Sequence, residues 1–134
     1  MVTGRPGATI LVVEDEPALR RTALRILGKL GYQVVLAERG EEALERLRLG
    51  QAFELVISDY HLPDTDGWRL LASLRAAGYA GGFVLTSGSD EEDLAGERPL
   101  EAGVPFLGKP FAIEELARVV REVLERHKPG EDGP

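Results

Sequence analysis

The sequence predicts an α/β fold. Along its 134 residues, five short apolar runs alternate with segments of helical period, and this alternation is typical of a sheet covered by helices on both faces. Four of the five runs are continuously apolar, as expected for parallel strands that are buried on both sides. The chain is long enough for one domain with a substantial core, and no repeat or second domain is visible.

The apolar runs are the predicted strands. In chain order they cover Thr9–Val13, Gln33–Ala37, Glu54–Ser58, Gly82–Thr86 and Pro105–Leu107. Right-handed crossovers leave few topologies open for such a chain. We expect a flavodoxin-like three-layer sandwich, with a five-stranded parallel sheet in the order 2-1-3-4-5.

Four segments have the period of a helix with one apolar face. Pro17 suits the first turn of the first segment, and Gly31 suits the position just past its end. Gly50 and Gly78 follow the second and third segments in the same way. The predicted helices are Pro17–Leu30, Gly40–Leu49, Trp68–Ala77 and Ile113–His127.

The connection between the fourth and fifth strands is less regular. Residues Asp90–Ala102 are rich in acidic side chains and contain Pro99, which would break a hydrogen bond inside a helix. We therefore expect about five helices in total, with the fourth one short or irregular.

Composition narrows the classes of function. The net charge is -7 and no basic stripe is present, so direct binding to nucleic acid is not expected. No apolar run approaches the ~20 residues of a membrane span. Cysteine is absent, which excludes thiolate metal sites and fits a cytoplasmic location. We expect an N-terminal extension at 1–7, the domain at 8–127 and a flexible tail or linker start at 128–134.

Charged and hydroxyl side chains follow four of the predicted strands. In such a sheet the carboxyl ends of the strands form the ligand site, at the switch point between strands 1 and 3. The residues at these ends are Glu14 and Asp15, Asp59, Thr86 and Ser87, and Lys109.

This set of side chains favours phosphoryl chemistry with a metal. Three crowded carboxylates recruit a cation or raise one another's pKa. Oxygen ligands without cysteine or clustered histidine favour a hard cation, most plausibly Mg²⁺. One accessible carboxylate can attack a phosphoryl group and form an acyl phosphate. Lys109 and Ser87 have the right chemistry to stabilise the transferred group from the opposite side.

Over about residues 8–127, the chain resembles the response regulator receiver domain. The motifs that carry the resemblance are Val12-Val13-Glu14-Asp15-Glu16, Val56-Ile57-Ser58-Asp59 with Pro63 and Asp66-Gly67, Leu85-Thr86-Ser87-Gly88, and Gly108-Lys109-Pro110-Phe111. The resemblance implies a phosphorelay protein in which a histidine kinase or histidine phosphotransfer protein phosphorylates Asp59. It implies no enzymatic activity beyond the domain's own phosphorylation and dephosphorylation. Phosphorylation would switch a protein-interaction surface around residues 90–127, which is read by an unknown downstream protein.

The resemblance also assigns the metal ligands. Asp15 and Asp59 would bind Mg²⁺ directly, together with the backbone carbonyl of His61. Glu14 matches a position that reaches the metal through water. Lys109 would bind the phosphoryl group. Its peptide bond to Pro110 matches one that is cis in the family, and cis peptide bonds occur almost only before proline.

The switch residues depart from the usual family pattern. Ser87 would supply the switch hydroxyl in place of the commoner threonine, although Thr86 also carries a hydroxyl. Phe106 would be the switch aromatic in place of the commoner tyrosine, so that ring cannot donate a hydrogen bond. Pro99 falls in the segment that usually forms the fourth helix and part of the output surface.

Each of these residues also has a purely structural explanation. Asp59 could cap a turn or helix, and Glu14-Asp15-Glu16 could be the acidic start of a helix. Lys109 could be a solvated loop lysine, and Phe106 could belong to the core. The basic residues of the first predicted helix are most simply a solvated face: Arg20, Arg21 and Arg25.

Two further motifs suggest other enzymes. Residues 103–109 have the spacing of a phosphate-binding loop, but Pro110 stands where a serine or threonine should bind Mg²⁺. Asp64 and Asp66 suggest an acidic nuclease-type site, but we interpret them as shaping the turn into the third helix. A Mg²⁺-dependent phosphatase or other phosphotransfer enzyme is a further alternative, but the haloacid dehalogenase-like kind needs an Asp-x-Asp pair at the end of the first strand, where this sequence has Glu14-Asp15-Glu16. A phosphorylation-independent scaffold is the remaining alternative.

Overall fold

The computed structural model describes residues 7–88 and 103–126. Five strands form one parallel sheet in the order 2-1-3-4-5, as predicted. They are β1 (Thr9–Val13), β2 (Gln33–Ala37), β3 (Leu55–Asp59), β4 (Gly82–Ser87) and β5 (Phe106–Gly108).

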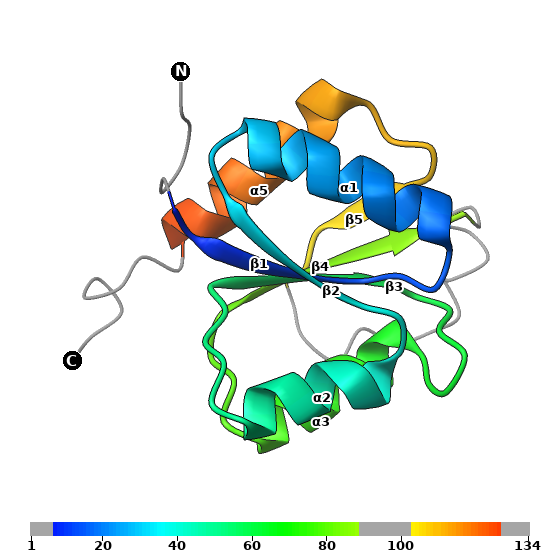
Figure 1. Cartoon of the computed structure of the whole chain (residues 1–134), viewed down its shortest axis with the longest axis vertical. Coiled ribbons are helices and arrows are strands. Elements are labelled where there is room, and N and C mark those ends of the chain that lie inside the picture. Colours follow the sequence, from blue (N-terminus) through cyan, green and yellow to red (C-terminus); the bar gives the residue numbers. More distant parts are fainter. Residues whose placement is uncertain (1–6, 89–102, 127–134) are drawn as a thin grey trace.

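Helices cover both faces of this sheet, which makes the flavodoxin-like three-layer sandwich that the sequence predicts (Figure 1). The described helices are α1 (Pro17–Lys29), α2 (Gly40–Arg48), α3 (Gly67–Ala76) and α5 (Ile113–Arg126). Helices α1 and α5 lie above the sheet in Figure 1, and α2 and α3 lie below it. The expectation of an irregular fourth helix at Asp90–Ala102 falls outside the described residues.

The helix signals in the sequence correspond to observed helix ends. Pro17 lies in the first turn of α1. Gly31, Gly50 and Gly78 follow the first three helices with positive φ angles of 95°, 90° and 102°, a conformation that only glycine adopts without strain. All four helices begin and end within about one residue of the predicted bounds.

Three strands extend one residue further toward their carboxyl ends than predicted. The parallel ladder continues there, because Asp59 pairs with Thr86 and Ser87 pairs with Gly108. The difference matters for function, since it places Asp59 and Ser87 on the sheet itself. Side chains on a hydrogen-bonded strand are held more firmly than side chains on a loop.

Alternating strand residues divide the core into two clusters. In β1, Ile10 and Val12 pack toward α1 and α5, whereas Leu11 and Val13 pack toward α2 and α3. Leu27 and Leu124 complete the first cluster with no exposed surface. Burying one such side chain stabilises the fold by about 1.5–3 kcal/mol. Among the described residues, no helix has the length and apolar character to cross a membrane.

Candidate functional site

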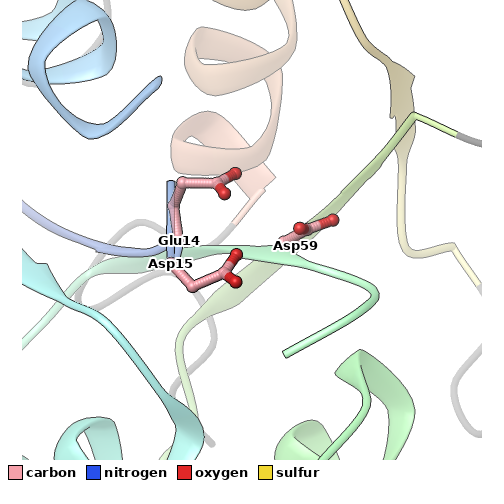
Figure 2. Close-up of side chains that lie close together, drawn as sticks. All are labelled: Glu14, Asp15 and Asp59. Atoms are coloured by element: carbon pink, nitrogen blue, oxygen red, sulfur yellow. The ribbon is translucent and has the colours of Figure 1, made fainter. Parts of the chain in front are cut away.

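Three carboxylates meet at the carboxyl edge of the sheet. Figure 2 shows Glu14 and Asp15, which follow β1, beside Asp59, the last residue of β3. One ligand oxygen from each residue lies within 4.8 Å of the others. The pairing of Val13 with Ser58 explains this, because it puts the next residues of both strands side by side. The predicted meeting of the three acids is confirmed.

Lys109 completes this acidic cluster. Its Nζ donates to Oε1 of Glu14 at 2.8 Å and lies 3.2 Å from Oδ2 of Asp59. The backbone holds the lysine in place, because the Lys109 N–H donates to the carbonyl of Ser87 at 2.8 Å. The side chains of Lys109, Glu14 and Asp59 are only 12%, 7% and 10% exposed. The alternative of a solvated loop lysine is therefore wrong.

The electrostatics of the cluster follow from burial and pairing. Burial raises the pKa of Glu14 above its usual value, and the hydrogen bond from Lys109 offsets only part of this effect. Burial disfavours the charged form of Lys109, but the hydrogen bond to Glu14 and the charge of Asp59 outweigh it and raise the pKa of Lys109. Lys109 is therefore charged at neutral pH.

The cluster fits a hard divalent cation. Its donor atoms are all carboxylate oxygens, and one from each residue lies within 4.8 Å of the others. One ammonium cannot neutralise three ionised carboxylates, so negative charge remains that a cation would offset. Glu14 and Asp59 are buried whereas Asp15 is exposed, which leaves the site open to solvent on one side. Such an open all-oxygen site suits Mg²⁺, which keeps several water ligands.

Of the three acidic residues after β1, only Glu16 lies at the start of the helix. Glu16 occupies the N-cap position of α1 without a capping hydrogen bond from its side chain, and the first turn contains no acidic residue. The N–H of Glu16 instead donates to Oε2 of Glu14 at 3.0 Å. Both oxygens of Glu14 are therefore engaged, one by Lys109 and one by the backbone.

The loop after Asp59 folds back against the strand. Gly67 N–H donates to the carbonyl of Tyr60 at 2.8 Å. A Cβ atom at Gly67 would clash with the buried side chain of Leu85 and would lie 3.4 Å from the carbonyl of Asp59. Only glycine therefore allows this close approach. His61 is exposed and its ring meets that of Tyr60 edge-on at 4.9 Å, while the metal role of its carbonyl stays a prediction.

The two other acids of this loop serve as helix caps. Asp66 accepts the N–H of Arg69 at 2.9 Å and caps α3, so it shapes the turn as predicted. The prediction is wrong for Asp64, which accepts the N–H groups of Gly40 and Glu41 at 2.9 Å and caps α2 instead. The sequence gives no sign of this contact, because it joins residues 24 positions apart. Neither acid belongs to the acidic cluster.

The predicted switch residues lie on β4 and β5. Ser87 is fully buried at the end of β4. Thr86 is buried beside it and pairs with Asp59, so both hydroxyl residues are near the site. Phe106 is half-buried and packs against the core cluster on the side of α2 and α3. The switch roles of Ser87 and Phe106 stay predictions.

Two details near Lys109 agree with the sequence analysis. The bond between Lys109 and Pro110 is cis, as the resemblance implies. Residues 106–108 form a strand, so this segment is not a phosphate-binding loop that opens a helix.

Arg20 is a residue of the site that sequence reasoning missed. The prediction of a solvated face on the first helix is correct for the exposed Arg21 and Arg25 but wrong for Arg20. Its side chain is 16% exposed, and its Nη1 donates to the backbone carbonyl of Glu14 at 2.8 Å. The only available signal was its place one turn into the helix that follows the acids.

Comparison with known proteins yields consistent matches. The family model described as "Response regulator receiver domain" matches residues 10–121. Sensor kinase CckA of Brucella abortus (strain 2308) is 42% identical over 121 residues, which cover 90% of this chain and 13% of that protein. Response regulator MprA of Mycobacterium avium (strain 104) is 38% identical over 126 residues, covering 92% of this chain and 54% of that protein.

The chain therefore spans about half of one relative and a small part of the other. Among solved structures, a receiver domain of a sensor histidine kinase from Pseudomonas aeruginosa PAO1 superposes with a TM-score of 0.78 at 29% identity. The match covers 89% of this chain and 98% of that one, and the P. aeruginosa domain has a magnesium ion coordinated in its active site cleft.

Proposed function

Because the chain belongs to the response regulator receiver domain family, whose members act in phosphorylation-based two-component signalling, we propose that Asp59 is its phosphoacceptor. One observation carries this proposal. Asp59 is a buried carboxylate at a strand end, held 3.2 Å from the ammonium of Lys109 and beside two further acids. Burying a carboxylate costs free energy, so a buried carboxylate is expected where its charge serves a function.

The donor would be a phosphohistidine of a histidine kinase or a histidine phosphotransfer protein. An oxygen of Asp59 attacks the phosphorus atom and forms an acyl phosphate. The bond between phosphorus and the imidazole nitrogen breaks, and the imidazole keeps the electron pair and takes up a proton. Lys109 already lies beside the attacking carboxylate and would bind the oxygens of the transferred group.

Mg²⁺ would be held by Asp15, Asp59 and the backbone carbonyl of His61, with Glu14 contributing through water. When bound, it would offset the negative charge of the carboxylates and of the incoming phosphoryl group. The fit of the acidic cluster to a hard cation and the magnesium ion in the P. aeruginosa receiver domain support this assignment.

The signal would leave through contacts with another protein. Ser87 would respond to the phosphoryl group, and Phe106 on the neighbouring strand would pass the change to a surface around residues 90–127. The domain would occupy residues 8–127. We propose a cytoplasmic protein that catalyses only its own phosphorylation and dephosphorylation and contacts neither nucleic acid nor membrane directly.

The test is incubation with acetyl phosphate and MgCl₂, followed by intact-mass measurement. The protein should gain the mass of one phosphoryl group. Asp59→Asn should gain none, and chelation of the metal with EDTA should prevent the gain in the unaltered protein. Asp66→Asn is the matched control, since Asp66 is an acid of the same loop that lies outside the cluster. The proposal fails if Asp59→Asn is still phosphorylated or if no adduct forms.

A further inference from the structure

We propose that Arg20 is a positioning residue for the metal site and acts through the backbone carbonyl of Glu14. The inference rests on the proposed function, because the Mg²⁺ site is part of that function. It extends the site to α1, beyond the acids, hydroxyl and lysine of the strand ends.

The contact lies at the peptide bond between two of the acids. The carbonyl of Glu14 belongs to the rigid plane that leads to Asp15, so its direction constrains how both side chains leave the strand. Arg20 Nη1 donates to this carbonyl at 2.8 Å. On the preceding peptide, the N–H of Glu14 donates to the carbonyl of Ala37 at 2.9 Å. The backbone of Glu14 is therefore held on both sides, and Arg20 supplies one of the two contacts.

The carbonyl of Glu14 lies just past the end of β1, whose last residue is Val13, and a backbone carbonyl near the core requires a donor. Arg20 provides a charge-assisted hydrogen bond, which is stronger than a neutral one. Its Nη2 also lies 3.6 Å from Oε1 of Glu38, just after β2. The guanidinium thus bridges α1 to the ends of two adjacent strands.

Two effects of Arg20 on Mg²⁺ binding have opposite signs. Its positive charge repels a cation, so removing it would tighten binding if charge alone acted. Its hydrogen bond orients the acids, so removing it would weaken binding. Loss of an outer partner of metal ligands typically costs 10–100-fold in metal affinity, whereas a partly solvated charge contributes little. The effect on orientation should therefore dominate. Weaker Mg²⁺ binding after removal of Arg20 identifies a positioning role, whereas tighter binding identifies an effect of charge alone.

The experiment is calorimetric titration with MgCl₂ of four proteins. Arg20→Met keeps the apolar stem and removes the donor and the charge, and should bind Mg²⁺ about tenfold more weakly. Arg21→Met removes the same charge from the exposed neighbouring residue and should bind as the unaltered protein does. Arg20→Lys retains a charged donor and should recover most of the affinity. Equal or tighter binding by Arg20→Met overturns the proposal.

Two further measurements separate positioning from a general role in folding. In the metal-free protein, the Glu16 amide, which donates to the side chain of Glu14, should exchange faster in Arg20→Met than in Arg21→Met. In acetyl phosphate labelling, Arg20→Met should need about tenfold more MgCl₂ for half-maximal rate, with a nearly unchanged maximum. A lower melting temperature with unchanged Mg²⁺ affinity and amide exchange would show a merely structural role and overturn the proposal.

The proposed function and this inference fail differently. If the unaltered protein binds no Mg²⁺, both are wrong. If it binds Mg²⁺ and Arg20→Met binds equally well, only the role of Arg20 is wrong. Should Arg20→Met not fold, Arg20→Leu is used instead, since it also removes both the hydrogen-bond donor and the charge, and the same outcomes decide.

Discussion

At the scale of single residues, Lys109 and Glu14 stabilise an arrangement that would otherwise repel itself. The ammonium of Lys109 contacts two of the three clustered acids, and each partner is nearly buried. Glu14 uses its second oxygen to hold the N–H of Glu16. Glu14 therefore holds both the lysine and the start of the loop after β1.

Lys109→Met should lower the free energy of unfolding by up to about 3 kcal/mol at pH 7, because two buried carboxylates lose their cation. Hydrogen bonding to Glu14 and the charge of Asp59 outweigh burial and raise the pKa of Lys109 above 10.5. A raised pKa means that this stabilisation is fully present below pH 10.5 and is lost as the pH rises through the folded-state value.

Urea unfolding of the unaltered protein and of Lys109→Met at pH 7 and at a series of higher pH values measures this effect. The two stabilities should differ at pH 7 and approach each other as the pH rises beyond 10.5. A difference that persists unchanged above the pKa of the lysine would show that packing of the side chain, rather than its charge, supports the fold.

At the scale of elements, α2 depends on a cap from another part of the chain. Its own N-cap residue, Arg39, makes no side-chain cap hydrogen bond. Asp64 supplies the cap from the loop between β3 and α3. A Cβ atom at Gly40 would come within 2.6 Å of the Thr65 side chain, so the helix start packs tightly on this loop. The loop that follows Asp59 is therefore held against the start of α2 by these hydrogen bonds and by this packing.

Asp64→Ala should lower the free energy of unfolding by about 0.5–1 kcal/mol at pH 7, the lower range for a lost cap, since the carboxylate is exposed. Although burial favours the neutral acid, the N–H donors of Glu41 and Gly40 hold the pKa of Asp64 below 3.8. Because this pKa is lowered, the cap stabilises the folded protein fully above pH 3.8. The stabilisation is lost as the pH falls through the pKa that Asp64 has in the folded state.

Thermal unfolding at pH 7 and at pH 2–3 tests the role of this cap. The deficit of Asp64→Ala should shrink on acidification, and Asp64→Asn, which keeps an acceptor oxygen, should lose less than Asp64→Ala at pH 7. Equal losses in both variants at both pH values would contradict a role as a charged cap.

At the scale of the whole molecule, the layered sheet gathers the site from distant parts of the chain. Glu14 and Lys109 are 95 positions apart yet hydrogen-bonded. The two core clusters fix the strands from opposite faces, so the strand ends hold their spacing. A cation that links the ends of β1 and β3 should therefore stabilise the entire fold.

Saturating Mg²⁺ should raise the free energy of unfolding by RT ln(1 + [Mg²⁺]/Kd), or about 2.7 kcal/mol at 100 times Kd. Differential scanning calorimetry with and without MgCl₂ measures the increase, and EDTA should reverse it. Asp15→Asn removes one carboxylate of the cluster and should show a much smaller increase. An equal increase in that variant would place the ion elsewhere.

The sequence by itself determined the fold and the membership of the acidic cluster. Continuous apolar runs, helical periods and glycines after helices are local signals, since strand burial and helix ends depend on neighbouring residues. The parallel order then brings Glu14, Asp15 and Asp59 together, because the carboxyl ends of parallel strands share one edge. These predictions are confirmed in the structure.

Only the tertiary structure decided how this edge is held. Three contacts hold it: Arg20 donates to the carbonyl of Glu14, Asp64 caps α2, and Lys109 pairs with two carboxylates. Each contact joins groups that are far apart in sequence or that lie on different elements. No local pattern encodes them, because a long polar side chain on a helix or loop reaches solvent or a partner according to what packing places beside it. Because of this packing, Arg20, which the sequence predicts at the surface, donates a hydrogen bond to the backbone of the site.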